Sequence, residues 1–126
     1  MKLRIHENSI RLRLNRSEVA QLAEVGRVEN AVEFGTNGKL SYSVEAAPGL
    51  ESARAVFVNG DIRVEVPAGA AREWAATDRV EISGEQRGRD DRRLSILVEK
   101  DFKCIHRDSP EDADSFPNPL AMHERE

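Results

Sequence analysis

The sequence has little of what the familiar classes of enzyme require. It contains a single cysteine, so no disulfide can form within the chain. Only 5% of its residues are aromatic, and the core must therefore be built from Val, Ile, Leu and Ala. No phosphate-binding glycine loop, nucleophile elbow, His-Glu-x-x-His motif or CxxC pair is present. These absences favour a non-catalytic binding or interaction module over an enzyme.

Long apolar runs are also missing. Met1 leads directly into Lys2-Leu-Arg-Ile5, and no later stretch has the length and apolar character of a membrane span. We therefore expect no signal peptide and no membrane contact. A single cysteine fits the reducing environment of the cytoplasm, which is the expected location.

Charge is distributed unevenly along the chain. From Asp108 onward there are six acidic residues and one basic residue, so this tail has a net charge of −5. The whole chain sums to −4, which leaves residues 1–107 at about +1. A nearly neutral core argues against nucleic-acid binding.

The chain is expected to consist of one domain and a tail. Residues 1–107 have the length of a single domain. The proline-containing tail (108–126) has too few apolar residues to form a core of its own, and Phe116 is expected to be the residue that docks it on the domain.

The first half of the domain reads as two hairpins joined by a helix. Alternating polar and apolar residues predict strands over 2–6 and 9–14, and again over 27–34 and 39–46. The helix between the hairpins has an N-cap at Asn15 and a C-terminal stop at Gly26. Its expected buried stripe consists of Val19, Leu22, Ala23 and Val25.

The second half repeats this pattern after Pro48-Gly49. Strands over 54–58 and 61–66 flank Asn59-Gly60, a strong hairpin signal. Pro67 suits the first position of a short helix anchored by Trp74. A strand over 79–84, a charged loop over 85–93 and a long central strand over 94–106 complete the domain.

The two halves, about 1–46 and 53–106, are similar in sequence. With a shift of 52 residues, six of the twenty positions across Ile10–Glu29 are identical, and Leu22 falls on Trp74. A loop two residues longer in the second half then aligns Leu40–Glu45 with Leu94–Glu99, giving four identities in six. Random pairing gives roughly one match in fifteen. We therefore favour an internal duplication, with two unrelated hairpin–helix runs as the alternative.

The expected fold class is α+β and mostly β. Two duplicated ββαββ units would form an antiparallel, eight-stranded curved sheet or barrel, with the two helices packed outside. The same elements could instead form two sheets packed face to face. In either arrangement each strand has an apolar face toward the core and a polar face on the other side.

The polar strand faces carry the candidate anion-binding residues, which are Arg4, Arg11, Arg13 and Arg63. Guanidinium groups bind phosphate and carboxylate bidentately, so a barrel lined by them would bind a small anion. Duplicated tunnels that hydrolyse triphosphates are broadly similar, but their Glu-x-Glu-x-Lys signature is absent. A solvated polar face explains the same arginines, and we favour it.

Cys104 and His106 are the candidate metal ligands. Two residues apart on a strand, they would point to the same side and could share zinc. The acidic residues that could complete such a site are Asp108, Asp112 and Asp114. A buried structural Cys104 beside Phe102 is the favoured alternative, because free cysteine is among the most buried residue types. A metal- or anion-dependent enzyme is thus the second functional hypothesis, and no cofactor is required by the first.

Three groups of residues resemble one known family. They are the opening Met1–Ile5 with Asn8–Leu14, the closing Leu97–Phe102 with Cys104, and a tail containing Glu111-Asp112, Asp114 and Phe116–Pro119. The chain resembles an uncharacterised family of small bacterial proteins, a domain of unknown function. This resemblance implies a compact stand-alone protein and supplies no activity, ligand or catalytic residue.

The partner is expected to be a protein or a small anion, and the chain is expected to be a monomer or a homodimer.

Overall fold

The computed structural model describes residues 1–102, which form eight strands, two α-helices and a 3-10 turn. In chain order the elements are β1 (Lys2–His6), β2 (Ser9–Leu14), α1 (Arg16–Val25), β3 (Arg27–Glu33), β4 (Lys39–Ala47), β5 (Arg54–Val58), β6 (Asp61–Pro67), α2 (Ala68–Ala76), β7 (Glu81–Arg87), η1 (Arg89–Asp91) and β8 (Arg93–Lys100). The strands form two four-stranded sheets, sheet A in the order β1-β2-β8-β7 and sheet B in the order β3-β4-β6-β5. The described strands close no barrel, so that part of the expectation is wrong.

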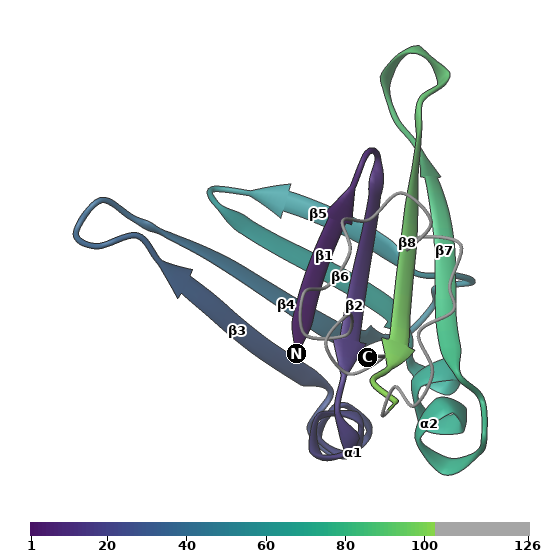
Figure 1. Ribbon diagram of the computed structural model, residues 1–126. Helices are drawn as coiled ribbons and strands as arrows, with labels where there is room; N and C mark the ends of the chain where they lie inside the picture. Colours follow the sequence, from purple (N-terminus) through teal and green to yellow (C-terminus); the bar gives the residue numbers. More distant parts are fainter. Residues whose placement is uncertain (103–126) are drawn as a thin grey trace, which may run out of the picture.

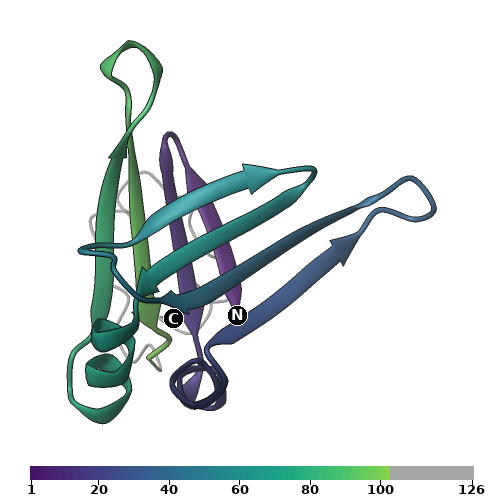
Figure 2. The same ribbon diagram turned by 180° about the vertical axis from the view of Figure 1, so that it is seen from behind.

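The two sheets form a wedge with the helices at its closed end (Figures 1 and 2). Helices α1 and α2 contact each other, and each also contacts strands of both sheets. Leu22 of α1 and Trp74 of α2 are fully buried there, and Trp74 Nε1 donates a hydrogen bond to Val80 O at 2.9 Å. The helices therefore belong to the core of the wedge and do not coat the outside of a barrel.

All four predicted hairpins form, but the expectation of a wholly antiparallel arrangement is wrong. Within each sheet the two hairpins meet through a parallel central pair, β2–β8 in sheet A and β4–β6 in sheet B. The reason is that each helix takes the chain from one sheet to the other. The hairpins of one half thus lie in different sheets, and each sheet combines one hairpin from each half.

The strand registers of the two sheets correspond position by position. Adding 52 to the residue numbers of all five β1–β2 pairs gives the five β5–β6 pairs. Adding 54 to all seven β3–β4 pairs gives the seven β7–β8 pairs. The same two shifts relate the parallel pairs of sheet A to those of sheet B, for example Leu12↔Val98 to Val64↔Val44.

This correspondence corrects the alignment of the halves. The β3–β4 and β7–β8 loops both contain five residues, so the predicted longer hairpin loop is wrong. Instead, Gly26 alone separates α1 from β3, whereas residues 77–80 separate α2 from β7. Val28 therefore occupies the register position of Ile82 and not that of Val80. Burial agrees, because Val28 and Ile82 are 4% and 2% exposed whereas Val80 is 47% exposed.

Local capping chemistry explains where α1 begins and ends. Asn15 and Glu18 form the predicted capping box, in which each side chain accepts a hydrogen bond from the other residue's backbone. Gly26 has a φ of 89° and ends the helix as expected. The predicted stripe is wrong at Val25, which is 73% exposed because it faces away from the wedge. Helix α2 begins at Ala68, with Pro67 as the last residue of β6.

One corner of the wedge is closed by direct contact between β5 and β7. Ala53 N donates to Ser83 O at 3.1 Å, and the Gln86 side chain bonds both the N–H and the carbonyl of Ala55, at 2.8 and 2.9 Å. Gly84 permits this approach, since a Cβ built on it would lie 1.9 Å from Ala53 O. At the other corner, between β1 and β3, the register places Leu3 where Ala55 lies and Val32 where Gln86 lies.

The central strand β8 confirms the prediction of a strand within the core, but it is shorter than expected. It ends at Lys100, and Phe102 is 62% exposed, so the expectation of a buried Phe102 is wrong. The single core cluster draws its fully buried side chains from both sheets and both helices. Among residues 1–102, no helix has the length and apolar character needed to cross a membrane.

Candidate functional site: an arginine face on sheet A

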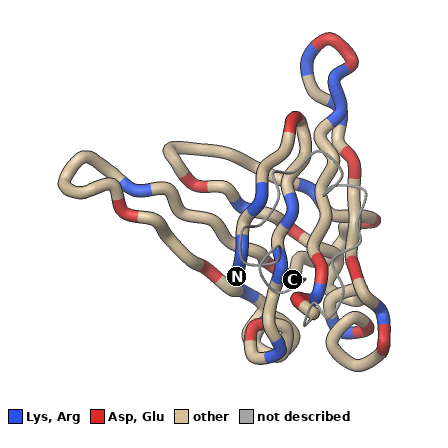
Figure 3. Tube along the Cα trace, in the orientation of Figure 1, with Lys and Arg blue, Asp and Glu red and all other residues tan. Residues whose placement is uncertain are grey.

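The outer face of β1 and β2 carries a cluster of basic side chains. Strand alternation directs Leu12 and Leu14 into the core and the residues between them to the other side. We call the basic residues on this side the arginine face: Lys2, Arg4, Arg11 and Arg13. Figure 3 shows Lys and Arg along both strands of this hairpin. Three of the four predicted anion-binding residues thus lie together.

The arginine face places like charges directly opposite each other. Arg4 pairs in register with Arg11, and Lys2 pairs with Arg13. Side chains opposite each other in an antiparallel pair lie about 4.5–5.5 Å apart at Cβ, and like charges in this arrangement are destabilising. The hairpin therefore maintains a concentration of positive charge that does not favour its own folding.

Two carboxylates at the neighbouring end of β8 offset part of this charge. Arg13 Nε lies 2.7 Å from Glu99 Oε1, and Arg11 Nε lies 3.6 Å from the same oxygen. Lys2 Nζ lies 3.0 Å from Asp101 Oδ2. Because the face has more basic groups than these neighbouring acids, it keeps a net positive charge within the described part of the chain. The sequence-based prediction missed Lys2, although the alternation of β1 places it on the same side as Arg4.

Arg63, the fourth predicted residue, lies on the outer face of sheet B and does not join the others. It shares that face with a row of charged residues that crosses all four strands, in which two central glutamates lie between two arginines: Arg27–Glu45–Glu65–Arg54. Arg54 Nε contacts Glu65 at 2.8 Å, and Arg27 contacts both Glu29 and Glu45. The hydrogen bond to Glu29 is the largest of the effects that raise the pKa of Arg27 above its usual value; the hydrogen bond to Glu45 and both carboxylate charges add to it, and burial opposes it. Sheet B thus balances most of its own charge.

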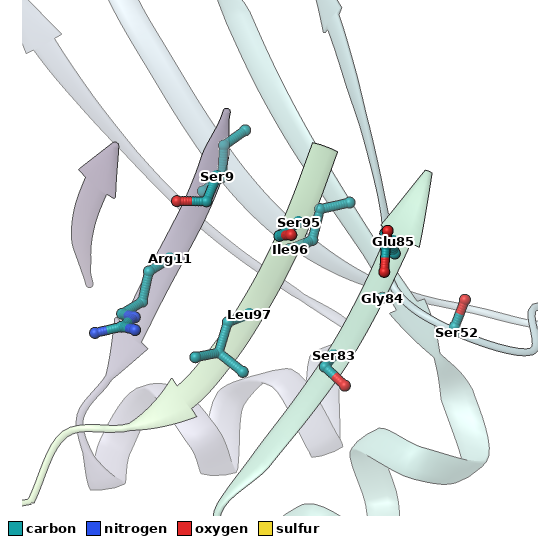
Figure 4. A pocket seen from close by; sticks show the side chains of 10 residues that line it. Ser9, Arg11, Ser52, Ser83, Gly84, Glu85, Ser95, Ile96 and Leu97 are labelled. Carbon is teal, nitrogen blue, oxygen red and sulfur yellow. The ribbon is translucent and has the colours of Figure 1, made fainter. Parts of the chain in front are cut away.

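A shallow hollow of about 640 Å³ crosses the outer side of sheet A next to the arginine face. Its polar lining consists of four serines, Ser9, Ser52, Ser83 and Ser95, together with Arg11 on β2 and Glu85 on β7 (Figure 4). Arg11 and Leu97 point to the same side of the sheet in this view. The hollow is open and combines one cation with one anion, so it does not enclose a small charged ligand.

The candidate metal residues lie outside the described part of the chain. These are Cys104, His106, Asp108, Asp112 and Asp114. Within residues 1–102 there is no cluster of three or more His, Cys, Asp or Glu side chains that could hold a metal ion. The premise of a strand that continues to residue 106 is wrong, because β8 ends at Lys100. The zinc site stays a prediction.

Comparison with known proteins gives one match. No curated protein matches the chain, and no solved structure does. One family model, described as a family of unknown function (DUF7009), matches residues 1–120. The match includes the arginine face, both sheets and the first part of the tail. Because it covers nearly all of the 126 residues, the chain belongs to this family of unknown function.

Proposed function

We propose that this protein is a non-catalytic binding module that takes an acidic segment of another protein on the arginine face. The supporting observation is the like-charge register of β1 and β2. The corresponding positions on β5 and β6 carry Arg54, Val56, Arg63 and Glu65. The charge at these four positions is +4 on sheet A and +1 on sheet B. The same backbone architecture can therefore carry nearly balanced charges at these positions, as sheet B does, whereas sheet A carries an excess of positive charge.

The shape of the face favours an extended acidic segment over a small anion. Its four basic residues form two cross-strand pairs, and these pairs are two residues apart, or about 7 Å along the strands. A site for a small ligand normally encloses that ligand, whereas this face lies open on the outside of the sheet. An acidic chain that passes over the face could contact both pairs in turn.

We also infer that the two halves arose by internal duplication. The support is the correspondence of every strand pair under shifts of 52 and 54 residues. Two backbone hydrogen bonds follow the same shifts: Ser95 N to Asn8 O corresponds to Ser41 N to Gly60 O. On this interpretation, sheet B is an internal control for sheet A, since it has the same architecture without the excess charge.

Binding of a fluorescein-labelled peptide of ten glutamates tests the function directly. The double variant Arg4→Gln/Arg11→Gln removes one cross-strand pair from the arginine face. Its matched control, Arg54→Gln/Arg63→Gln, removes two charges from sheet B. We expect the first variant to weaken binding about tenfold at 50 mM salt and the control to weaken it less than twofold.

Three results would contradict the proposal. The first is equal loss of affinity in the two double variants, because long-range charge alone would then explain binding. The second is no measurable binding either to the parent protein or to a variant with fewer acidic residues in the tail, Asp112→Asn/Asp114→Asn. The third is tighter binding of a ten-base-pair DNA duplex than of the peptide, since phosphate recognition would then be the property of this face.

A further inference from the structure

We propose that the arginine face is occupied within the same molecule by the acidic tail, residues 108–120, which an external acidic partner must displace. This inference rests on the proposed function, because it concerns the regulation of the same face. It follows from three features: where the chain leaves sheet A, the charge of the tail, and the extent of the family match.

The chain leaves the sheet beside the arginine face. Asp101, the residue after β8, donates its backbone N–H to Leu14 O at the end of β2, at 2.9 Å. Its side chain contacts Lys2 at 3.0 Å. The residues that follow Phe102 are thus tethered at one end of the face, and the first acidic contact with the face has already been made by Asp101.

The tail has the right charge and enough length. Asp108, Glu111, Asp112 and Asp114 begin six residues after Phe102. At about 3.3 Å per residue, the intervening chain reaches roughly 20 Å, which is comparable to the length of β2. A tether this short gives an effective concentration on the order of millimolar. Ion pairs too weak to hold a separate peptide would therefore hold this one.

The family match separates two groups of acidic residues in the tail. It ends at residue 120, so it includes Asp112 and Asp114 and excludes Glu124 and Glu126. A tail segment that belongs to the shared pattern of the family is expected to have a role within the domain. Glu124 and Glu126 lie beyond residue 120, so they provide a matched pair of acidic residues for which no role within the domain is expected.

Paramagnetic relaxation in the full-length protein tests the contact. The variant Cys104→Ser/Ser115→Cys moves the single thiol of the chain to position 115, within the acidic segment, and a nitroxide label is attached to that thiol. Amide relaxation is then compared between the arginine face and the corresponding positions on β5 and β6. We expect several-fold stronger enhancement on sheet A than on sheet B. Equal enhancement on the two sheets overturns the inference.

Two pairs of charge-removing substitutions in the labelled protein test whether the contact is electrostatic. The enhancement on sheet A should be largely lost with Asp112→Asn/Asp114→Asn. It should be retained with Glu124→Gln/Glu126→Gln, which removes the same number of charges from the end of the tail. Enhancement that is unchanged by the first pair overturns the inference.

Affinity for the ten-glutamate peptide separates this inference from the proposed function. If the tail competes, Asp112→Asn/Asp114→Asn binds the peptide about threefold to tenfold more tightly than the parent, and Glu124→Gln/Glu126→Gln binds like the parent. Equal affinity of all three proteins overturns the tail inference and leaves the proposed function standing. No binding by any of them overturns the proposed function, and the tail inference falls with it.

Discussion

Replacing Gly84 with alanine should be among the most damaging single changes in this protein. Gly84 lies in the middle of β7 with an ordinary strand conformation, so backbone strain is not the reason. The reason is space: the added Cβ would lie 1.9 Å from Ala53 O, 2.7 Å from Ala53 C and 2.8 Å from Ala53 N. All three atoms belong to the backbone and cannot rotate away.

The cost follows from what must move. Ordinary contact begins near 3.4 Å, so the segment containing Ala53, just before β5, must retreat by about 1.5 Å. This movement breaks three hydrogen bonds at the closed corner, from Ala53 N to Ser83 O and from the Gln86 side chain to both polar groups of Ala55. At about 0.5–1.5 kcal/mol each, the loss of all three lowers the free energy of unfolding by about 1.5–4.5 kcal/mol. The melting temperature should fall by roughly 6–16 °C.

Gly69→Ala is the matched control. Gly69 lies in α2, and an added Cβ would meet only Arg72 Nη2, at 3.9 Å. Because alanine is the better helix former, this change should be neutral or stabilise by up to about 1 kcal/mol. Urea unfolding of both variants gives the comparison. A Gly84→Ala protein within about 0.5 kcal/mol of the parent would refute the account of the closed corner, because it means that the two strands are not held in contact.

Three further predictions concern the core, the first helix and the tail. Trp74→Ala should lower the free energy of unfolding by about 3–5 kcal/mol, since Trp74 is fully buried and bonds Val80; a loss under about 1 kcal/mol in urea unfolding would contradict this. Asn15→Ala should cost about 1 kcal/mol through loss of the capping box, whereas Asn15→Asp should retain most of the stability. If Cys104 and His106 bind zinc, the untagged protein should contain close to one equivalent by elemental analysis, and less than roughly a tenth of an equivalent would exclude the site.

Features set by neighbouring residues were predictable from the sequence. The capping box of α1 needs only Asn15 and Glu18, three residues apart, and its stop needs only Gly26. The hairpin at Asn59-Gly60 has Asn59 and Gly60 at φ of 50° and 76°, the left-handed region that this dipeptide favours. The composition of the arginine face was also predictable, because alternation alone puts Arg11 and Arg13 on one side of β2.

Features set by distant residues were not predictable. The contact of β2 with β8 joins residues more than eighty positions apart, and no local signal distinguishes it from a contact between β2 and a strand of its own half. The closed corner likewise depends on Gly84 and Gln86 meeting a segment some thirty residues earlier. The sequence-based prediction placed Gly84 at the end of a strand, where a glycine commonly marks a boundary.

Sequence identity also led to a misleading alignment in one place. Arg27-Val-Glu29 and Arg79-Val-Glu81 match in three residues of three, and this match moved the two-residue insertion into the hairpin loop. The register assigns Arg27–Glu29 to residues 81–83 instead. Burial is the stronger criterion here, because a strand shifted by two residues keeps its alternation and changes only which residues reach the core.

The difference between the two sheets has a simple origin in the course of the chain. At the end of β4 in sheet B, Ala47 leads into the turn at Pro48-Gly49, and the chain returns as β5. At the corresponding end of β8 in sheet A, Asp101 leads into the acidic tail. In the chain, the acidic residues 108–114 thus follow the last strand of sheet A, and no such segment follows the corresponding strand of sheet B. The excess positive charge lies on the same sheet, on strands β1 and β2, and Asp101 contacts a residue of each: Lys2 of β1 and Leu14 of β2. Sheet A thus has both the excess positive charge and the acidic continuation of the chain, and sheet B has neither. This is expected if the positive charge of the arginine face serves to bind an acidic ligand.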